Sequence, residues 1–147
     1  SMDLKNWIAD LDAPQATYPK CTGCKVHAGF YIGYQEVSPT VKSQVQLILN
    51  KYRNTEIYVT GHSLGAALSA LAALDIKATF GKVDQLINFG QPRVGNQAFA
   101  DYLARQLPST FRVIHYADLV PHLPPLELLG YRHGGAQIWY TEDMQKY

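Results

Sequence analysis

The residues of this sequence with the clearest capacity for chemistry are the five from Gly61 to Gly65, which spell Gly-His-Ser-Leu-Gly. A serine hydroxyl becomes a useful nucleophile only when a positioned base accepts its proton. The pattern G-x-S-x-G is typical of a serine exposed on a sharp turn between a strand and a helix, yet the bare pattern also arises by chance. The segments on either side of the pentad therefore decide what Ser63 does.

The flanking segments have the composition of a strand and a helix. The run from Glu56 to Thr60 is β-branched and aromatic, and an Ala- and Leu-rich stretch follows the pentad to about Thr79. Small residues surround the turn: Gly61, Gly65, Ala66 and Ala67. They leave room for close backbone approach, so we interpret Ser63 as the nucleophile and the Leu64 N–H as a donor to a developing oxyanion. The alternative is a serine that only caps the helix.

The other periodic segments predict the architecture that must position this turn. Apolar spacing predicts a helix over Val41 to Tyr52 and another from about Asn96 to Gln106. Further strands are expected at Val83 to Phe89, Phe111 to His115 and Ala136 to Tyr140. Strands that alternate with helices favour a mostly parallel sheet with helical crossovers, so we expect one α/β domain over residues 1–147.

A short helix is also expected near the start of the chain. Its apolar residues fall on a single stripe, at positions i, i+3, i+4 and i+7: Leu4, Trp7, Ile8 and Leu11. Pro14 ends it. An ordinary surface helix would show the same stripe.

Asp118 follows the strand expected at Phe111 to His115. A carboxylate just past a buried strand is well placed to orient an imidazole and to stabilise its charged form. The alternative is an aspartate that only shapes the turn before Pro121. His62 is a poor base for its neighbour because consecutive side chains on a turn diverge, and His115 is expected to be a core histidine.

Cys21 and Cys24 form a C-x-x-C pair with three possible roles: a redox dithiol, half of a zinc site or a short-loop disulfide. A redox pair usually opens a helix, and the stretch Lys25 to Phe30 does not look helical. Zinc would need further ligands, and only His27 is close by in sequence. The disulfide is favoured, and it implies an oxidising compartment.

Composition excludes some classes of partner. The 13 Lys and Arg nearly balance the 12 Asp and Glu. The chain therefore has no large net positive charge whose electrostatic field would attract nucleic acid or an anionic membrane. The apolar stretch Leu64 to Leu74 falls well short of the ~20 residues of a membrane span. No apolar signal core is found at the N-terminus, so any secretion signal is expected to lie upstream or to have been removed.

Six sequence blocks, in order, resemble the class 3 fungal-type triacylglycerol lipases and their relatives, the feruloyl esterases. The blocks are Asn6–Leu11, Val26–Phe30, Gly61–Gly65, Gly90–Gly95, Asp118–Pro125 and His133–Gly135. The resemblance implies an α/β-hydrolase fold that is incomplete at both ends, with Ser63 as nucleophile and Asp118 as the acid of a triad. The triad histidine is then expected beyond Tyr147, because the block at His133 precedes a strand and carries no base in this family.

The resemblance also assigns the first residues. The segment Asp3 to Leu11 resembles the family's lid, and Ser1 falls at the spacing of the second oxyanion donor. The implied substrate is an acylglycerol or another neutral ester met at a lipid–water interface, by a secreted enzyme without cofactor or metal. Two alternatives remain open: a feruloyl esterase, and a non-catalytic module with the hydrolase fold that binds a partner.

Overall fold

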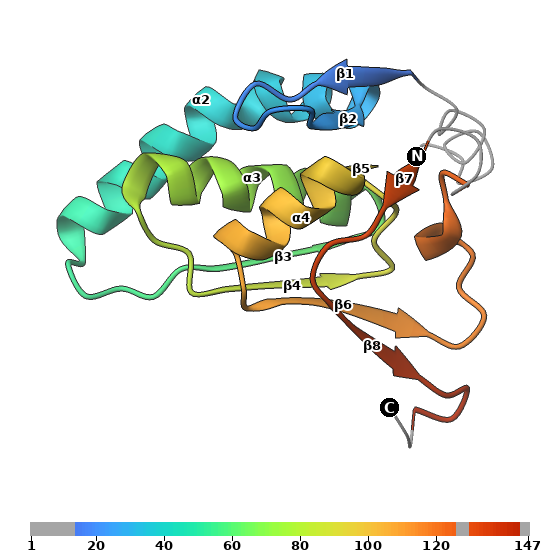
Figure 1. Ribbon diagram of the computed structural model, residues 1–147. Coiled ribbons are helices and arrows are strands. Elements are labelled where there is room, and N and C mark those ends of the chain that lie inside the picture. Colours follow the sequence, from blue (N-terminus) through green and yellow to red (C-terminus); the bar gives the residue numbers. More distant parts are fainter. Residues whose placement is uncertain (1–13, 126–129, 145–147) are drawn as a thin grey trace.

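The computed structural model describes residues 14–125 and 130–144 (Figure 1). Its centre is a sheet of four strands that all run parallel, in the order β3-β4-β6-β8. The strands are β3 (Tyr58–His62), β4 (Gln85–Phe89), β6 (Thr110–His115) and β8 (Ala136–Tyr140). Because all four strands run parallel, the residues after each strand lie at the same edge of the sheet.

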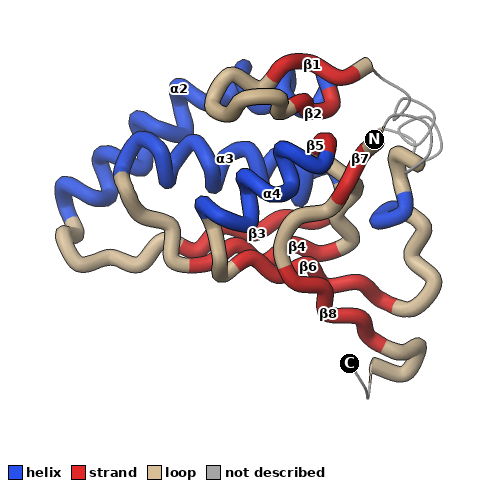
Figure 2. The backbone as a smooth tube through the Cα atoms, in the orientation of Figure 1, coloured by secondary structure: helices blue, strands red, loops and turns tan. Residues whose placement is uncertain are grey.

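Three helices cover one face of this sheet: α2 (Ala28–Lys51), α3 (Leu64–Phe80) and α4 (Gln97–Gln106). In Figures 1 and 2 no described element covers the opposite face. The alternation along β4 reflects this, since Leu86 and Asn88 are buried beneath α3 while Phe89 is exposed. Parallel sheets are normally buried on both faces, so this sheet presents an apolar surface that the described residues leave open.

A second, antiparallel sheet of short strands lies at the other side of the helices, in the order β1-β2-β5-β7. Its strands are β1 (Gln15–Thr17), β2 (Lys25–His27), β5 (Gly95–Asn96) and β7 (Tyr131–Arg132). The predicted disulfide between Cys21 and Cys24 is confirmed, and it closes the turn between β1 and β2.

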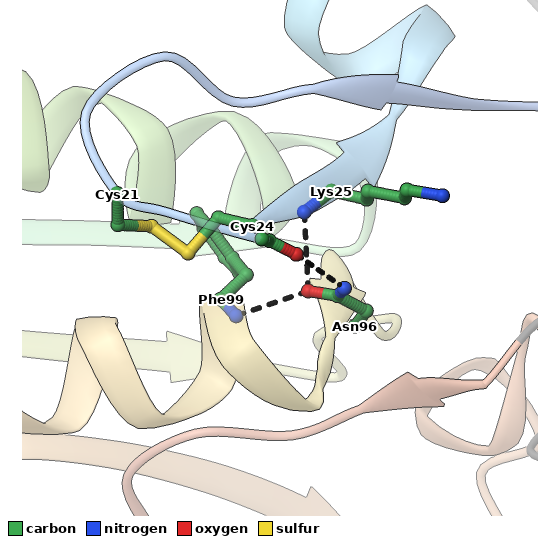
Figure 3. The surroundings of a disulfide bond; sticks show 6 residues. Cys21, Cys24, Lys25, Asn96 and Phe99 are labelled. Carbon is green, nitrogen blue, oxygen red and sulfur yellow. Dashed lines mark hydrogen bonds between the residues drawn. A yellow bond between two sulfur atoms is a disulfide. The ribbon is translucent and has the colours of Figure 1, made fainter.

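Asn96 ties this disulfide turn to the start of α4 (Figure 3). Its Oδ1 accepts hydrogen bonds from the backbone N–H of Lys25 (3.1 Å) and of Phe99 (3.0 Å). Its Nδ2 donates to the carbonyl of Gly23 (2.9 Å). One side chain is therefore both the N-cap of α4 and the clamp that holds the disulfide turn against it.

The helices α2 and α3 are joined by a buried polar network around Asp75. Its carboxylate accepts hydrogen bonds from Tyr34 Oη (2.8 Å) and Ser38 Oγ (2.9 Å) on α2. Lys20 and Lys42 form ion pairs with the same carboxylate. These bonds keep the pKa of Asp75 below its usual range although burial alone would raise it.

Several expectations about the elements need correction. The stretch expected to be non-helical after Cys24 is strand only as far as His27, and α2 begins at Ala28, well before Val41. Glycines at 29 and 33 weaken the local helical signal, but burial of Phe30 and Tyr34 stabilises the helix. His27 caps it, since its Nδ1 accepts from the Phe30 N–H (3.3 Å).

The helix expected near the chain start, with Leu4, Trp7, Ile8 and Leu11, lies outside the described residues, as does Ser1. The strands and helices expected after Glu56 are all present, with ends shifted by one or two residues. The four short strands of the second sheet were not predicted, because each has only two or three residues and no period to detect.

Candidate active site

Ser63 occupies a sharp turn between β3, which ends at His62, and α3, which begins at Leu64. Its backbone has φ 54° and ψ −124°, a region that residues with a Cβ seldom adopt. The turn is fixed by the Ser63 N–H, which donates to the carbonyl of Phe89 (3.0 Å) at the end of β4. This strained strand-to-helix turn is the geometry that exposes a nucleophilic serine.

Gly61 is required by this turn. A Cβ at Gly61 would lie 2.3 Å from the carbonyl oxygen of Gly65 and 2.7 Å from the nitrogen of Ala66. At Gly65 the same Cβ would meet nothing within 4 Å in the described part of the chain. The expectation that both glycines make room therefore holds for Gly61, where strand and helix backbones touch.

Asn88 supports the turn from below and was not singled out from the sequence. Its side chain is fully buried under α3. Its Nδ2 donates to the Ala66 carbonyl (2.9 Å) in the first turn of α3, and its Oδ1 accepts from Ser69 Oγ (2.6 Å). The available signal was an amide two residues after Leu86, on the face of the strand that strand alternation predicts to be buried.

Asp118 lies at the same edge of the sheet, three residues after β6. Its Oδ1 accepts from the Val120 N–H (3.0 Å), which fixes the carboxylate. Its Oδ2 lies 2.8 Å from the position that a Cβ would take on Gly90, the residue after β4. Gly90 has φ +53°, and its backbone N–H donates to the carbonyl of Val113 in β6 (3.0 Å). Gly90 thus lets the carboxylate approach the strand next to the one that carries Ser63.

The histidines near this edge do not complete a triad within the described residues. There, no hydrogen bond joins an imidazole to Ser63 or to Asp118. His62 Nε2 lies 3.7 Å from the Cβ position on Gly90, and its side chain is exposed. His115 is also exposed, and its Nε2 contacts the carbonyl of Glu142 (3.2 Å), so the expectation of a core histidine was wrong. His115 ends its strand and faces away from the helices.

His133 is occupied elsewhere. Its Nε2 donates to the carbonyl of Pro121 (2.7 Å), since a carbonyl can only accept. Burial, together with the positive charges of Arg112 and Arg93, lowers the pKa of His133 to about 3. A neutral imidazole bonded to a backbone carbonyl is a structural group, in line with the expectation that it carries no base.

The first N–H groups of α3 point out of its N-terminus and have no partner within the helix. Leu64 is the first residue of α3, directly after Ser63. A negative charge that develops on an oxygen beside Ser63 is stabilised by such donors and by the helix dipole.

Across residues 14–125 and 130–144, no three His, Cys, Asp or Glu side chains are grouped to hold a metal ion. Within the same ranges, no helix is long and apolar enough to cross a bilayer.

Comparison with known proteins places this geometry in a family. The family model described as lipase (class 3) matches residues 1–128. A lipase from Rhizomucor miehei is 38% identical over 147 residues, covering 97% of this chain and 40% of the relative. A secreted mono- and diacylglycerol lipase from Fusarium solani is 37% identical over 139 residues, covering 95% of this chain and 41% of the relative.

Comparison with solved structures also gives lipases. A triacylglycerol lipase whose catalytic centre is described as a serine protease triad superposes with a TM-score of 0.88 at 40% identity, over 95% of this chain and 54% of its own. The chain thus spans less than half of the two relatives above and about half of this structure. With the serine turn, the sheet order and these matches taken together, the chain belongs to the class 3 lipase family and has the α/β-hydrolase fold.

Proposed function

We propose that the protein containing this chain is a secreted lipase that hydrolyses the ester bonds of acylglycerols through an acyl-enzyme on Ser63. The observation that carries the proposal is the strained turn at Ser63, at the same edge of the sheet as Asp118. The names of the relatives, lipase and mono- and diacylglycerol lipase, support the substrate class. The disulfide and relatives named as secreted support an extracellular location.

In the proposed reaction the Ser63 Oγ attacks the ester carbonyl carbon while an imidazole takes the hydroxyl proton. The carbonyl oxygen becomes an oxyanion, to which the Leu64 N–H donates. The intermediate collapses, the bond to the alcohol breaks, and the imidazolium returns its proton to the leaving alkoxide. Water then hydrolyses the acyl-serine by the same steps and releases a carboxylic acid.

Asp118 would orient the imidazole and stabilise its charged form without taking the proton. The imidazole itself is proposed to come from a part of the full-length protein outside this chain, beyond Tyr147. That source is consistent with the share of its relatives that the chain spans. Ser1 is proposed as the second oxyanion donor.

The segment of Leu4, Trp7, Ile8 and Leu11 is proposed as a lid. An apolar stripe of this kind can cover the site in water and enter a lipid surface when the lid opens. We therefore expect the full-length enzyme to favour emulsified acylglycerols over soluble aryl esters. Equal turnover of methyl ferulate, with no rise in rate at an oil–water interface, would favour a feruloyl esterase instead.

The decisive test is Ser63→Ala in the full-length protein, with Ser109→Ala at an exposed position as the matched control. Loss of a triad nucleophile typically lowers kcat by several orders of magnitude, about 10⁶-fold in well-studied cases. Ser63→Ala should also lose labelling by a fluorophosphonate while its melting temperature stays close to that of the wild type. Retention of more than ~1% of the wild-type rate would exclude Ser63 as nucleophile.

A further inference from the structure

Two arginines lie almost completely inside the molecule, away from Ser63. Arg93 lies between β4 and β5 and is 7% exposed, and Arg112 lies in β6 and is 5% exposed. Fully buried guanidinium groups are rare in proteins unless a carboxylate or another anion pairs with them. The hydrogen-bond acceptors and acidic side chains near Arg93 and Arg112 therefore decide whether the two positive charges are compensated.

Backbone carbonyls satisfy only part of these side chains. Arg93 Nη1 donates to the carbonyls of His122 and Pro124, the latter at 2.7 Å. The planar edge formed by its Nε and Nη2 has no partner among the described residues. Arg112 Nε donates to the Gly134 carbonyl (3.0 Å), while its Nη1 is buried and has no hydrogen-bond partner in that part of the chain.

Among the described residues, no acidic side chain forms an ion pair with either arginine. The three ion pairs among residues 14–125 and 130–144 all involve Asp75 or Asp84 and none involves these arginines. Burial and the charge of Arg93 lower the pKa of Arg112 to about 10, which leaves Arg112 protonated at neutral pH. Arg93 is charged as well, because a guanidinium group does not lose its proton in a protein at neutral pH. His133 is neutral there because its pKa is lowered to about 3. The region thus holds two buried positive charges and no described counter-charge.

Arg93 lines a cavity of about 450 Å³ that opens to solvent. Gln137 and Trp139, both exposed, form its outer wall, and Ile114 adds apolar surface. Gln137 pairs with Arg112 in the register of β6 and β8, so it lies on the same face of the sheet. The cavity therefore brings the Arg93 guanidinium together with the apolar side chains of Ile114, Pro121 and Trp139, and the polar His122, His133 and Gln137 complete its lining.

We propose that this cavity binds a small aliphatic carboxylate, with the two carboxylate oxygens on the Nε and Nη2 edge of Arg93. This edge matches the spacing of a carboxylate and allows two parallel charge-assisted hydrogen bonds. Arg112 lies outside the cavity lining but close enough to Arg93 for their charges to interact, so it adds positive potential. Ile114 and Trp139 accommodate a short hydrocarbon group. The site includes neither Ser63 nor Asp118, so it is additional to the proposed hydrolytic site and does not depend on it.

The test measures thermal unfolding of the full-length protein at neutral pH in sodium acetate, sodium butyrate and sodium chloride of equal ionic strength. Acetate should raise the melting temperature along a saturating curve, beyond the effect of chloride. Butyrate should bind more tightly, by up to about fourfold for each added methylene. Arg93→Lys should weaken acetate binding about tenfold or more, because a single ammonium cannot make the paired contact. Arg105→Lys, on the exposed side of α4, should leave it unchanged.

A second variant keeps the proposal testable if Arg93→Lys fails to fold. Gln137→Glu supplies a tethered carboxylate at the cavity and should raise the melting temperature while removing the response to acetate. Gln44→Glu, which adds the same charge at an exposed position of α2, should retain the full response. Acetate acting no more strongly than chloride, or an undiminished response in Gln137→Glu, would overturn the proposal. Stronger stabilisation by inorganic phosphate than by acetate would also overturn the assignment to a carboxylate.

Discussion

Gly90→Ala tests whether the glycine after β4 sets the position of the Asp118 carboxylate. The new Cβ would lie 2.8 Å from Asp118 Oδ2, whereas ordinary van der Waals contact begins at 3.4 Å. The carboxylate must therefore retreat by roughly 0.6 Å, the difference between these two distances. Displacements of about 1 Å in a catalytic group cost on the order of 10²-fold in rate. We expect kcat to fall about ten- to a hundredfold with little change in KM.

The substitution also carries a backbone cost that must be separated from this effect. Gly90 has φ +53°, and an L-residue in the left-handed region costs roughly 1–2 kcal/mol. Gly81→Ala supplies the matched control: its φ is +76°, and a Cβ there meets nothing within 4 Å in the described chain. Both variants should lose similar stability, and only Gly90→Ala should lose activity.

The assay is initial-rate hydrolysis of a soluble short-chain ester by the full-length protein, with thermal unfolding of the same samples. With a soluble substrate, the measured rate does not depend on binding to a lipid surface or on opening of the proposed lid at that surface. If Gly90→Ala retains the wild-type kcat, or if Gly81→Ala loses as much activity, then close approach at Gly90 does not position Asp118 for catalysis.

Two further predictions concern stability. Asp75→Asn removes the carboxylate that accepts from Tyr34 and Ser38 and pairs with two half-exposed lysines, and should lower the free energy of unfolding by about 1–2 kcal/mol at neutral pH. Since the pKa of Asp75 is depressed in the folded state, its contribution is complete above the unfolded value near ~4 and is lost as pH falls below it. Urea unfolding at several pH values should therefore show the gap to wild type closing in acid, and a constant gap would contradict the ion-pair account. Asn96→Ala removes the cap of α4 and the clamp on the disulfide turn, and should cost about 2 kcal/mol. A loss below ~0.5 kcal/mol in thermal unfolding would show that the disulfide alone holds that turn.

The sequence by itself determined the features that depend on neighbouring residues. The small residues around Ser63, the β-branched run before it and the Ala-rich stretch after it were enough to predict the strand, the turn and the helix. The strands and helices after Glu56 followed from their hydrophobic period, and the disulfide followed from the spacing of Cys21 and Cys24. In each case the physical cause acts within a few residues along the chain.

Tertiary structure decided the features that depend on residues far apart in sequence. The early start of α2 arises because Phe30 and Tyr34 are buried against other elements, which outweighs two helix-weakening glycines. The approach of Asp118 to Gly90 exists only because β4 and β6 are neighbours in the sheet. The two buried arginines likewise come from separate segments, and their shared lack of a counter-charge becomes visible only when the chain is folded. Local patterns fix which elements form, whereas packing fixes which charges and side chains meet.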